Sequence, residues 1–169
     1  QGSYTSGQTA ENQWGWLEIY PQNGYTKKAD GTYEEATVGV AANHSFVTGS
    51  LTAMNDEFVT GRSYTYVLGQ DKTPGAYKYG YFFSEQLKRA LEIDPELMFI
   101  DGWNEWLAGR NKQWNGVANA FPDTYDDEGS RDMEPTKGDM KDNYYALLVD
   151  AVRKFKGTEK RETAGDEKT

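Results

Sequence analysis

The chain has 169 residues, a formal net charge of −9 and no cysteine. Its length is that of one ordinary domain. The acidic balance argues against nucleic acid or an anionic membrane surface as a partner, because both need a basic footprint. The lack of cysteine excludes disulfides, thiolate metal sites and cysteine nucleophiles. The same acidic balance favours a neutral ligand. The apolar runs of the chain are too short to span a bilayer, so we expect no membrane insertion.

Three stretches of the chain predict strands of the buried type. They are residues 14–20, 36–42 and 97–101, each a largely apolar run that ends in polar residues. In α/β folds with parallel strands, active sites gather at the C-terminal strand ends. The polar residues that follow these runs are therefore the first candidates for a site.

Amphipathic patterns predict two helices, at residues 77–92 and at about 142–156. Gly157 follows the second pattern in the position of a C-cap. We expect the other segments to be a surface excursion at 25–35, a long loop at 46–76 with at most a short strand at 63–68, a second long loop at 107–139, and a polar tail or linker at 158–169.

This order of elements predicts an α/β chain in which residues 1–157 form the C-terminal portion of a (β/α)8 TIM barrel, incomplete in this chain. A complete barrel needs about 250 residues. We therefore expect the remainder of the barrel to come from further sequence or from another chain. Three strands cannot close around a core and would leave an exposed edge, so we also expect that the isolated chain is not a stable monomer.

The most informative motif is Trp103-Asn104-Glu105-Trp106, directly after the third predicted strand. Pyranose rings present C–H faces to aromatic rings, while a carboxyl group handles the proton or the glycosyl carbon. A carboxylate between two indoles therefore predicts a sugar-processing site with a largely buried Glu105 at its centre. The alternative is a buried glutamate that only holds the loop through hydrogen bonds.

This motif, together with Arg110 after it and Glu134-Pro135 before the last helix, resembles the C-terminal end of bacterial glycoside hydrolases and glycan-processing proteins related to the endo-α-mannosidase and endo-α-mannanase group. Those proteins are TIM barrels, and their active-site carboxylates are the Glu after Asn and the Glu three residues later. The resemblance spans about residues 97–157 and implies that Glu105 is the first carboxylate. Ala108 stands where the second is expected.

The resemblance implies a glycoside hydrolase that acts on a poly- or oligosaccharide and contains Glu105 as an active-site carboxylate. Ala108 leaves open the alternative of a non-catalytic carbohydrate-binding or structural module. For a protein that degrades polysaccharides we favour an extracellular or periplasmic location.

A glycosidase needs a second carboxyl group within about 5–10 Å of the first. We place Glu134 first, because it matches a family position and Arg131 lies nearby in the sequence. Glu18, in the first predicted strand, is the second candidate. Asp101 is the third, and it is equally a candidate for a structural anchor of the loop.

The predicted substrate-binding residues lie in the motif, just after it, or at predicted strands: Trp103, Asn104, Trp106, Arg110, His44, Trp16 and Glu18. His44 suits a substrate hydrogen bond or a proton relay, but a lone surface histidine is an equal alternative. Arg110 either orients Glu105 or a substrate carboxylate, or it forms a salt bridge with the acidic run at 126–128. Metal-binding and phosphate-binding motifs are absent, so we expect no metal and no cofactor.

Overall fold

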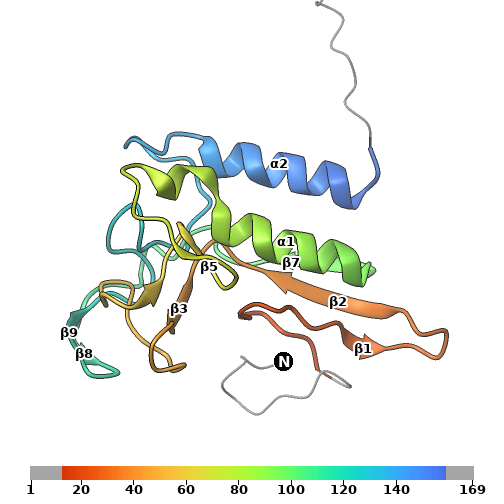
Figure 1. The fold of residues 1–169 in the computed structure, drawn as a ribbon, viewed down its shortest axis with the longest axis horizontal. Coiled ribbons are helices and arrows are strands. Elements are labelled where there is room, and N and C mark those ends of the chain that lie inside the picture. The colour runs from red at the N-terminus through yellow and green to blue at the C-terminus, as the bar shows by residue number, and fades with distance from the viewer. Residues whose placement is uncertain (1–12, 159–169) are drawn as a thin grey trace, which may run out of the picture.

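The computed structural model describes residues 13–158, and Figure 1 shows how their elements are arranged. Short strands and two α-helices alternate with long irregular segments. In chain order the elements are β1 (Tyr25–Lys27), β2 (Tyr33–Val38), β3 (Ala42–Ser45), β4 (Val59–Thr60), β5 (Tyr64–Thr65), β6 (Gly69–Gln70), the 3-10 helix η1 (Ala76–Tyr79), α1 (Tyr81–Ile93), β7 (Leu97–Ile100), β8 (Asn111–Trp114), β9 (Val117–Ala120) and α2 (Asn143–Phe155).

The main sheet has the strand order β1-β2-β7. β1 pairs with β2 in antiparallel fashion, whereas β2 and β7 are parallel, with Thr37 opposite Phe99 and Val38 opposite Ile100. α1 lies between β2 and β7 in the sequence and crosses over from one to the other. Both helices lie on the same side of this sheet, with α1 nearer to it (Figure 1).

One apolar cluster joins the sheet to both helices. Successive side chains of a strand point to opposite faces, so Ala36 and Val38 of β2 enter this cluster while Glu35 and Thr37 face away from it. Burial of aliphatic and aromatic side chains is the main stabilising contribution here. The fully buried members are Ala36, Val38, Val40, Phe83, Leu87, Ala90, Met133, Met140, Tyr144 and Ala151.

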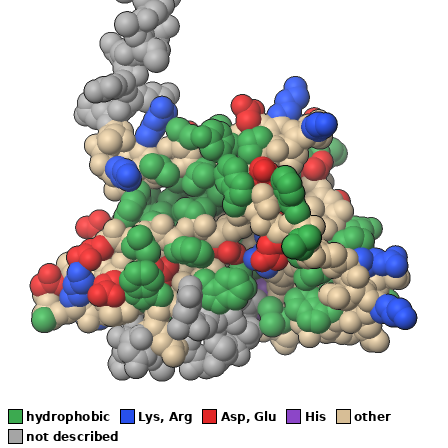
Figure 2. Space-filling model, turned by 180° about the vertical axis from the view of Figure 1, so that it is seen from behind, with side chains coloured by type: hydrophobic (Ala, Val, Ile, Leu, Met, Phe, Trp, Pro, Cys, Tyr) green, Lys and Arg blue, Asp and Glu red, His purple; other side chains and the backbone are tan. Residues whose placement is uncertain are grey.

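The opposite face of the sheet is only partly covered. Glu35 and Thr37 are buried there, and the backbone N–H of Gly15 donates to Glu35 Oε2 at 3.1 Å. Leu97 and Phe99 lie beside them in register, yet these two side chains are 42% and 37% exposed. Figure 2 shows the molecule from behind relative to Figure 1, and on this side apolar side chains remain at the surface among acidic ones. β7 therefore ends the sheet with one apolar face in solvent.

The prediction of a barrel portion is wrong. Apart from the parallel pair β2–β7, the described strands pair in antiparallel fashion, as β1–β2, β3–β4, β5–β6 and β8–β9. A (β/α)8 barrel repeats a strand and a helix eight times. Within residues 13–158 only β2–α1–β7 forms such a unit, and residues 14–20, predicted as a strand, are irregular.

The periodic elements were predicted correctly within a few residues. β7, α1 and α2 lie where the sequence predicts them, and Gly157, with φ 61°, follows α2. The predicted strand at 36–42 is instead divided at Gly39, whose backbone N–H donates to Gln86 Oε1 at 3.0 Å. Within residues 13–158 no helix is long and apolar enough to cross a bilayer.

Three predicted loops contain hairpins. Residues 25–35 include β1 and the start of β2, residues 46–76 include β4 and the β5–β6 hairpin, and residues 107–139 include β8 and β9. The predicted polar tail lies almost entirely outside the described residues. That the isolated chain is not a stable monomer stays a prediction, and the exposed face of β7 is consistent with it.

Candidate functional site

The turn at residues 103–106 follows β7 and packs against residues 131–134. Met133 N donates to Gly102 O at 2.7 Å, and Glu134 N donates to Trp103 O at 3.1 Å. Gly102 has φ 88°, and a Cβ atom there would lie 1.9 Å from Arg131 O. Only glycine tolerates both this backbone conformation and this close approach. Gly102 therefore allows residues 131–134 to lie directly beside the turn.

The carboxylate of Glu134 is held by two side chains of this turn. Asn104 Nδ2 donates to Glu134 Oε2 at 3.0 Å, and Trp106 Nε1 donates to the same oxygen at 2.9 Å. Glu134 itself is half-buried. The structure thus brings the first candidate partner carboxylate into direct contact with the turn that carries Glu105.

Glu105 is exposed, so the prediction of a largely buried carboxylate is wrong. The reason is that β7 is an edge strand, and the chain leaves it at the surface. The indoles of Trp103 and Trp106 are 49% and 78% exposed, and Trp103 meets the ring of Tyr145 edge-on at 6.2 Å. The turn therefore offers two indoles and a solvent-accessible carboxylate on one surface loop.

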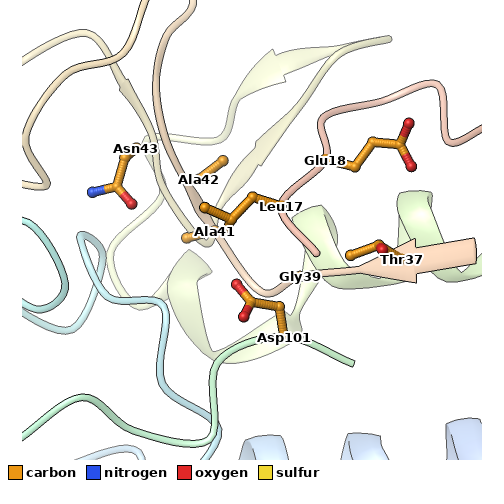
Figure 3. A pocket seen from close by; sticks show the side chains of 8 residues that line it. All are labelled: Leu17, Glu18, Thr37, Gly39, Ala41, Ala42, Asn43 and Asp101. Atoms are coloured by element: carbon orange, nitrogen blue, oxygen red, sulfur yellow. The ribbon is translucent and has the colours of Figure 1, made fainter. Parts of the chain in front are cut away.

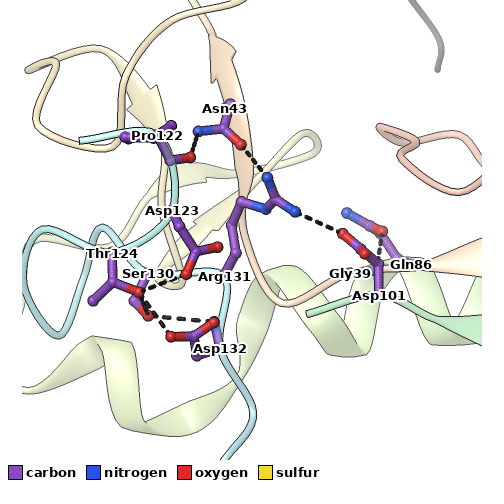
Figure 4. Close-up of polar contacts among 10 residues, drawn as sticks. All are labelled: Gly39, Asn43, Gln86, Asp101, Pro122, Asp123, Thr124, Ser130, Arg131 and Asp132. Carbon is purple, nitrogen blue, oxygen red and sulfur yellow. Dashed lines mark hydrogen bonds and ion pairs between the residues drawn. The ribbon is translucent and has the colours of Figure 1, made fainter. Parts of the chain in front are cut away.

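A buried arginine connects this turn to the sheet (Figure 4). Arg131 Nη2 donates to Asp101 Oδ2 at 3.1 Å, and Nη1 donates to Asn43 Oδ1 at 2.7 Å. The Arg131 and Asp101 side chains are only 7% and 14% exposed. Asp101 is thus an anchor of the loop, one of the two roles suggested by the sequence, and Arg131 forms its ion pair with Asp101. Such a buried pair holds its segments together because loss of one partner leaves the other charge unpaired.

Two aspartates lie beside Arg131 and were not singled out in the sequence. The hydroxyl Oγ1 of Thr124 lies 2.9 Å from Asp132 Oδ2 and 3.3 Å from Asp123 Oδ2 (Figure 4). Burial raises the pKa of Asp132 to about 7, and the charge of Asp123 adds to this effect. A neighbouring negative charge disfavours ionisation of a carboxyl group, which is why Asp123 adds to the effect of burial on Asp132. No local sequence motif marks this pair.

Glu18 and Glu35 form a second, buried carboxyl region, in which residues of the segment 14–25 donate hydrogen bonds to both glutamates. Tyr25 OH donates to Glu18 Oε1 at 2.8 Å, and Asn23 donates to the same oxygen from its backbone N–H and from its side-chain amide. Burial raises the pKa of Glu18 to about 7 against the effect of these hydrogen bonds, and burial also raises the pKa of Glu35. The alternation of Glu35 and Thr37 with Ala36 and Val38 places Glu35 on the face opposite the core, and its burial there depends on coverage by other segments, which no local pattern predicts.

Glu18 also lines a small pocket, here called the Glu18 pocket (Figure 3). Figure 3 shows Asn43 and Asp101 on one side of Leu17, with Glu18 and Thr37 on the other. The cavity volume is about 10 Å³, roughly what one water molecule needs. Because Asp101 is also bound to Arg131, the pocket adjoins the network that supports the turn. Its lining residues are Leu17, Glu18, Thr37, Gly39, Ala41, Ala42, Asn43 and Asp101.

His44, Trp16 and Arg110 are the other predicted substrate-binding residues. His44, on β3, is buried, with its Nδ1 3.4 Å from Tyr66 OH, so the alternative of a surface histidine is wrong. Burial lowers the pKa of His44, which favours the neutral imidazole. Trp16 is 36% exposed, and Arg110 is exposed without an ion pair to any described residue. The alternative of a salt bridge between Arg110 and the acidic run is therefore not seen in the described residues, and a role of Arg110 toward Glu105 or a substrate stays a prediction.

Within residues 13–158, no group of three or more His, Asp or Glu side chains is arranged to hold a metal ion. Comparisons of the chain with family models, with curated proteins and with solved structures find no match.

Proposed function

We propose that this protein is a glycoside hydrolase that acts on a poly- or oligosaccharide, with Glu105 and Glu134 as its two carboxyl groups. The observation that carries the proposal is the contact of Glu134 Oε2 with Asn104 and Trp106, which are 30 and 28 positions away in the sequence. Two candidate carboxyl groups are thereby associated with the same surface turn, one within it and one on the segment packed against it. Both flanking indoles are accessible there to the C–H face of a sugar ring.

The surroundings of the two glutamates suit different roles. Hydrolysis needs one carboxyl group that protonates the leaving oxygen, and a carboxylate that attacks the anomeric carbon or activates a water molecule. Two donors on Oε2 hold the carboxylate of Glu134 in one orientation, which suits a nucleophile or base that must keep its geometry. Glu105 is then left as the carboxyl group that acts at the leaving oxygen.

A second candidate function is carbohydrate binding without cleavage. Ala108 occupies the position at which the related hydrolases carry a second glutamate. The exposure of Glu105 also favours this alternative, because catalytic electrostatics are strongest in sites that exclude water. Both candidates use the same turn and the same ligand class, and they differ only in turnover.

The test uses the full chain with soluble α-mannan, galactan and glucan oligosaccharides. Calorimetry measures binding, and the release of reducing ends measures cleavage. We expect Glu105→Gln and Glu134→Gln each to lower the cleavage rate by a factor on the order of 10²–10⁴ while binding persists. Glu57→Gln, at an exposed glutamate of another loop, is the matched control and should keep full activity.

Trp106→Ala should lower the affinity for the same oligosaccharides by about tenfold, because it removes the more exposed indole of the turn. Binding without release of reducing ends would favour the second candidate function. An unmodified chain that neither binds nor cleaves any of these oligosaccharides would contradict both candidates. Full activity of Glu105→Gln would show that a different carboxyl group is catalytic.

A further inference from the structure

The two carboxyl oxygens of Glu18 have different surroundings. Oε1 accepts hydrogen bonds from Tyr25 OH and from both the backbone and the side chain of Asn23. Oε2 is buried and has no hydrogen-bond partner among the described residues. The whole residue is only 6% exposed, so bulk solvent has little access to this oxygen. A buried polar atom in this state gains free energy when a ligand atom bonds to it.

Glu35 shows that burial alone does not produce this asymmetry. It belongs to the same region and is 0% exposed, yet Thr37 Oγ1 donates to its Oε1 at 2.7 Å and Gly15 N donates to its Oε2 at 3.1 Å. Both oxygens of Glu35 are therefore satisfied within the protein. Glu18 differs by having one oxygen left over in a side chain that lines a pocket.

The Glu18 pocket has room for one small polar group. Small residues, Gly39, Ala41 and Ala42, form part of its wall, and its volume of about 10 Å³ matches one water molecule or one hydroxyl group. A second unpaired group lies behind Gly39. Gln86 is 0% exposed and accepts the Gly39 N–H with its Oε1, while its Nε2 has no partner among the described residues.

We propose that the Glu18 pocket is a hydroxyl-binding subsite of the carbohydrate site, in which Glu18 Oε2 forms a hydrogen bond with one hydroxyl group of the sugar. The proposal rests on the proposed function and extends its site from the turn, past Asp101, to Glu18. A hydroxyl group both donates and accepts, so it can bond to Glu18 in either protonation state. A charged ligand group is disfavoured, because its burial in so small a pocket would remove its hydration.

The first test follows Glu18 in the unmodified full chain. Glutamate labelled with ¹³C at the carboxyl carbon gives one resonance per residue, and Glu18→Gln identifies the Glu18 resonance by its loss. Addition of the α-mannan, galactan or glucan oligosaccharide that binds should shift this resonance in proportion to saturation. The resonance of Glu35 is the internal control and should stay in place, because both of its oxygens are already bonded.

The second test measures affinity by calorimetry. Glu18→Met keeps the length of the side chain but removes both oxygens, and it should weaken binding by about tenfold or more. Glu35→Gln should leave the affinity within about twofold, since Glu35 does not line the pocket. Among monodeoxy derivatives of the oligosaccharide, the one that lacks the bound hydroxyl should bind equally to the parent chain and to Glu18→Met.

The outcomes separate this inference from the proposed function. If an oligosaccharide binds and Trp106→Ala weakens it, but neither the Glu18 resonance nor the affinity of Glu18→Met changes, the subsite is wrong and the proposed function stands. If none of the oligosaccharides binds, both fail. Should Glu18→Met not fold, the resonance of the unmodified chain decides alone.

Discussion

The exposed turn at residues 103–106 and the buried region around Glu18 both present glutamates, but in opposite surroundings. At the turn, Glu105 is in solvent and Glu134 is held by two donors. Around Glu18, burial outweighs three hydrogen bonds and raises the pKa to about 7. The same side chain is therefore governed by its neighbours in one region and by desolvation in the other. Substitutions at the turn should alter ligand chemistry, and those near Glu18 should also alter stability.

The junction between the two regions should give the largest effect. Gly102→Ala places a Cβ atom 1.9 Å from Arg131 O at a residue with φ 88°. We expect a loss of about 3 kcal/mol or more in the free energy of unfolding, because both the backbone and residues 131–134 must shift. Gly109→Ala is the control, since a Cβ there meets no atom within 4 Å. Urea denaturation measures both, and equal stabilities of the two variants would contradict the close packing of the turn.

The buried region should reveal itself in the pH dependence of stability. The pKa of Glu18 rises from 4.5 to about 7 on folding, so the unfolded chain releases this proton first as the pH increases. Stability is therefore lost between about pH 4.5 and 7, and the loss is complete above pH 7, by up to about 3 kcal/mol. Glu18→Gln should match the parent near pH 4 and be more stable by about 2–3 kcal/mol at pH 8.

Urea denaturation at pH 4, 6 and 8 measures this difference. Asp132, whose pKa is also raised to about 7, contributes a slope of the same sign and remains in the variant. The variant should therefore keep part of the pH dependence. Parallel stability curves for Glu18→Gln and the parent chain would show that Glu18 titrates normally and would remove the contrast between the two regions.

The helices and β7 could be predicted because their patterns are local. Periodic apolar positions specify α1 and α2 without knowledge of the partner surface. An apolar run such as β7 does not reveal whether both of its faces are covered, and one face is exposed here. The β8–β9 hairpin had an overlooked signal, Asn115-Gly116 between two strands, where both residues have positive φ, as a type I′ turn requires.

Less of the candidate site could be predicted. The sequence associated Glu134 with the turn through a motif, and the two are in contact. The Asp101–Arg131–Asn43 network joins segments 30 and 88 positions apart, and no local pattern contains it. The exposure of Glu105 and the burial of Glu35 follow from which segments cover each face of the sheet, which is a tertiary property.

Glu128 tests whether an acidic loop residue with buried contacts behaves like Glu18. It belongs to the acidic run at 126–128, yet its Oε1 accepts hydrogen bonds from Ser63 N at 3.0 Å and from Ser63 Oγ at 2.7 Å. Burial raises the pKa of Glu128 despite these hydrogen bonds, so its ionised form is disfavoured in the folded chain. Glu128→Gln keeps an acceptor and removes the charge, and it should therefore be at least as stable as the parent chain at pH 8, as expected for Glu18→Gln. Asp127→Asn, at an exposed neighbour, should change stability by less than about 0.5 kcal/mol. Thermal denaturation at pH 8 compares them, and a clear loss of stability in Glu128→Gln would show that the charge strengthens the contacts with Ser63 by more than its burial costs.

The smallest effect on stability should come from the turn itself. Trp106→Phe removes the N–H that donates to Glu134 Oε2 but keeps an aromatic ring. Because Trp106 is 78% exposed, water can replace this donor, and the free energy of unfolding should change by no more than about 0.5 kcal/mol. The carboxylate of Glu134 would then be oriented by Asn104 alone, so the cleavage rate should fall more than the affinity for the oligosaccharide does. Denaturation, calorimetry and reducing-end release on the same preparation measure the three quantities. A loss of stability above about 1.5 kcal/mol would contradict this prediction. It would show that water cannot replace the Trp106 donor, as expected for a contact in the buried region around Glu18 and not for one in an exposed turn.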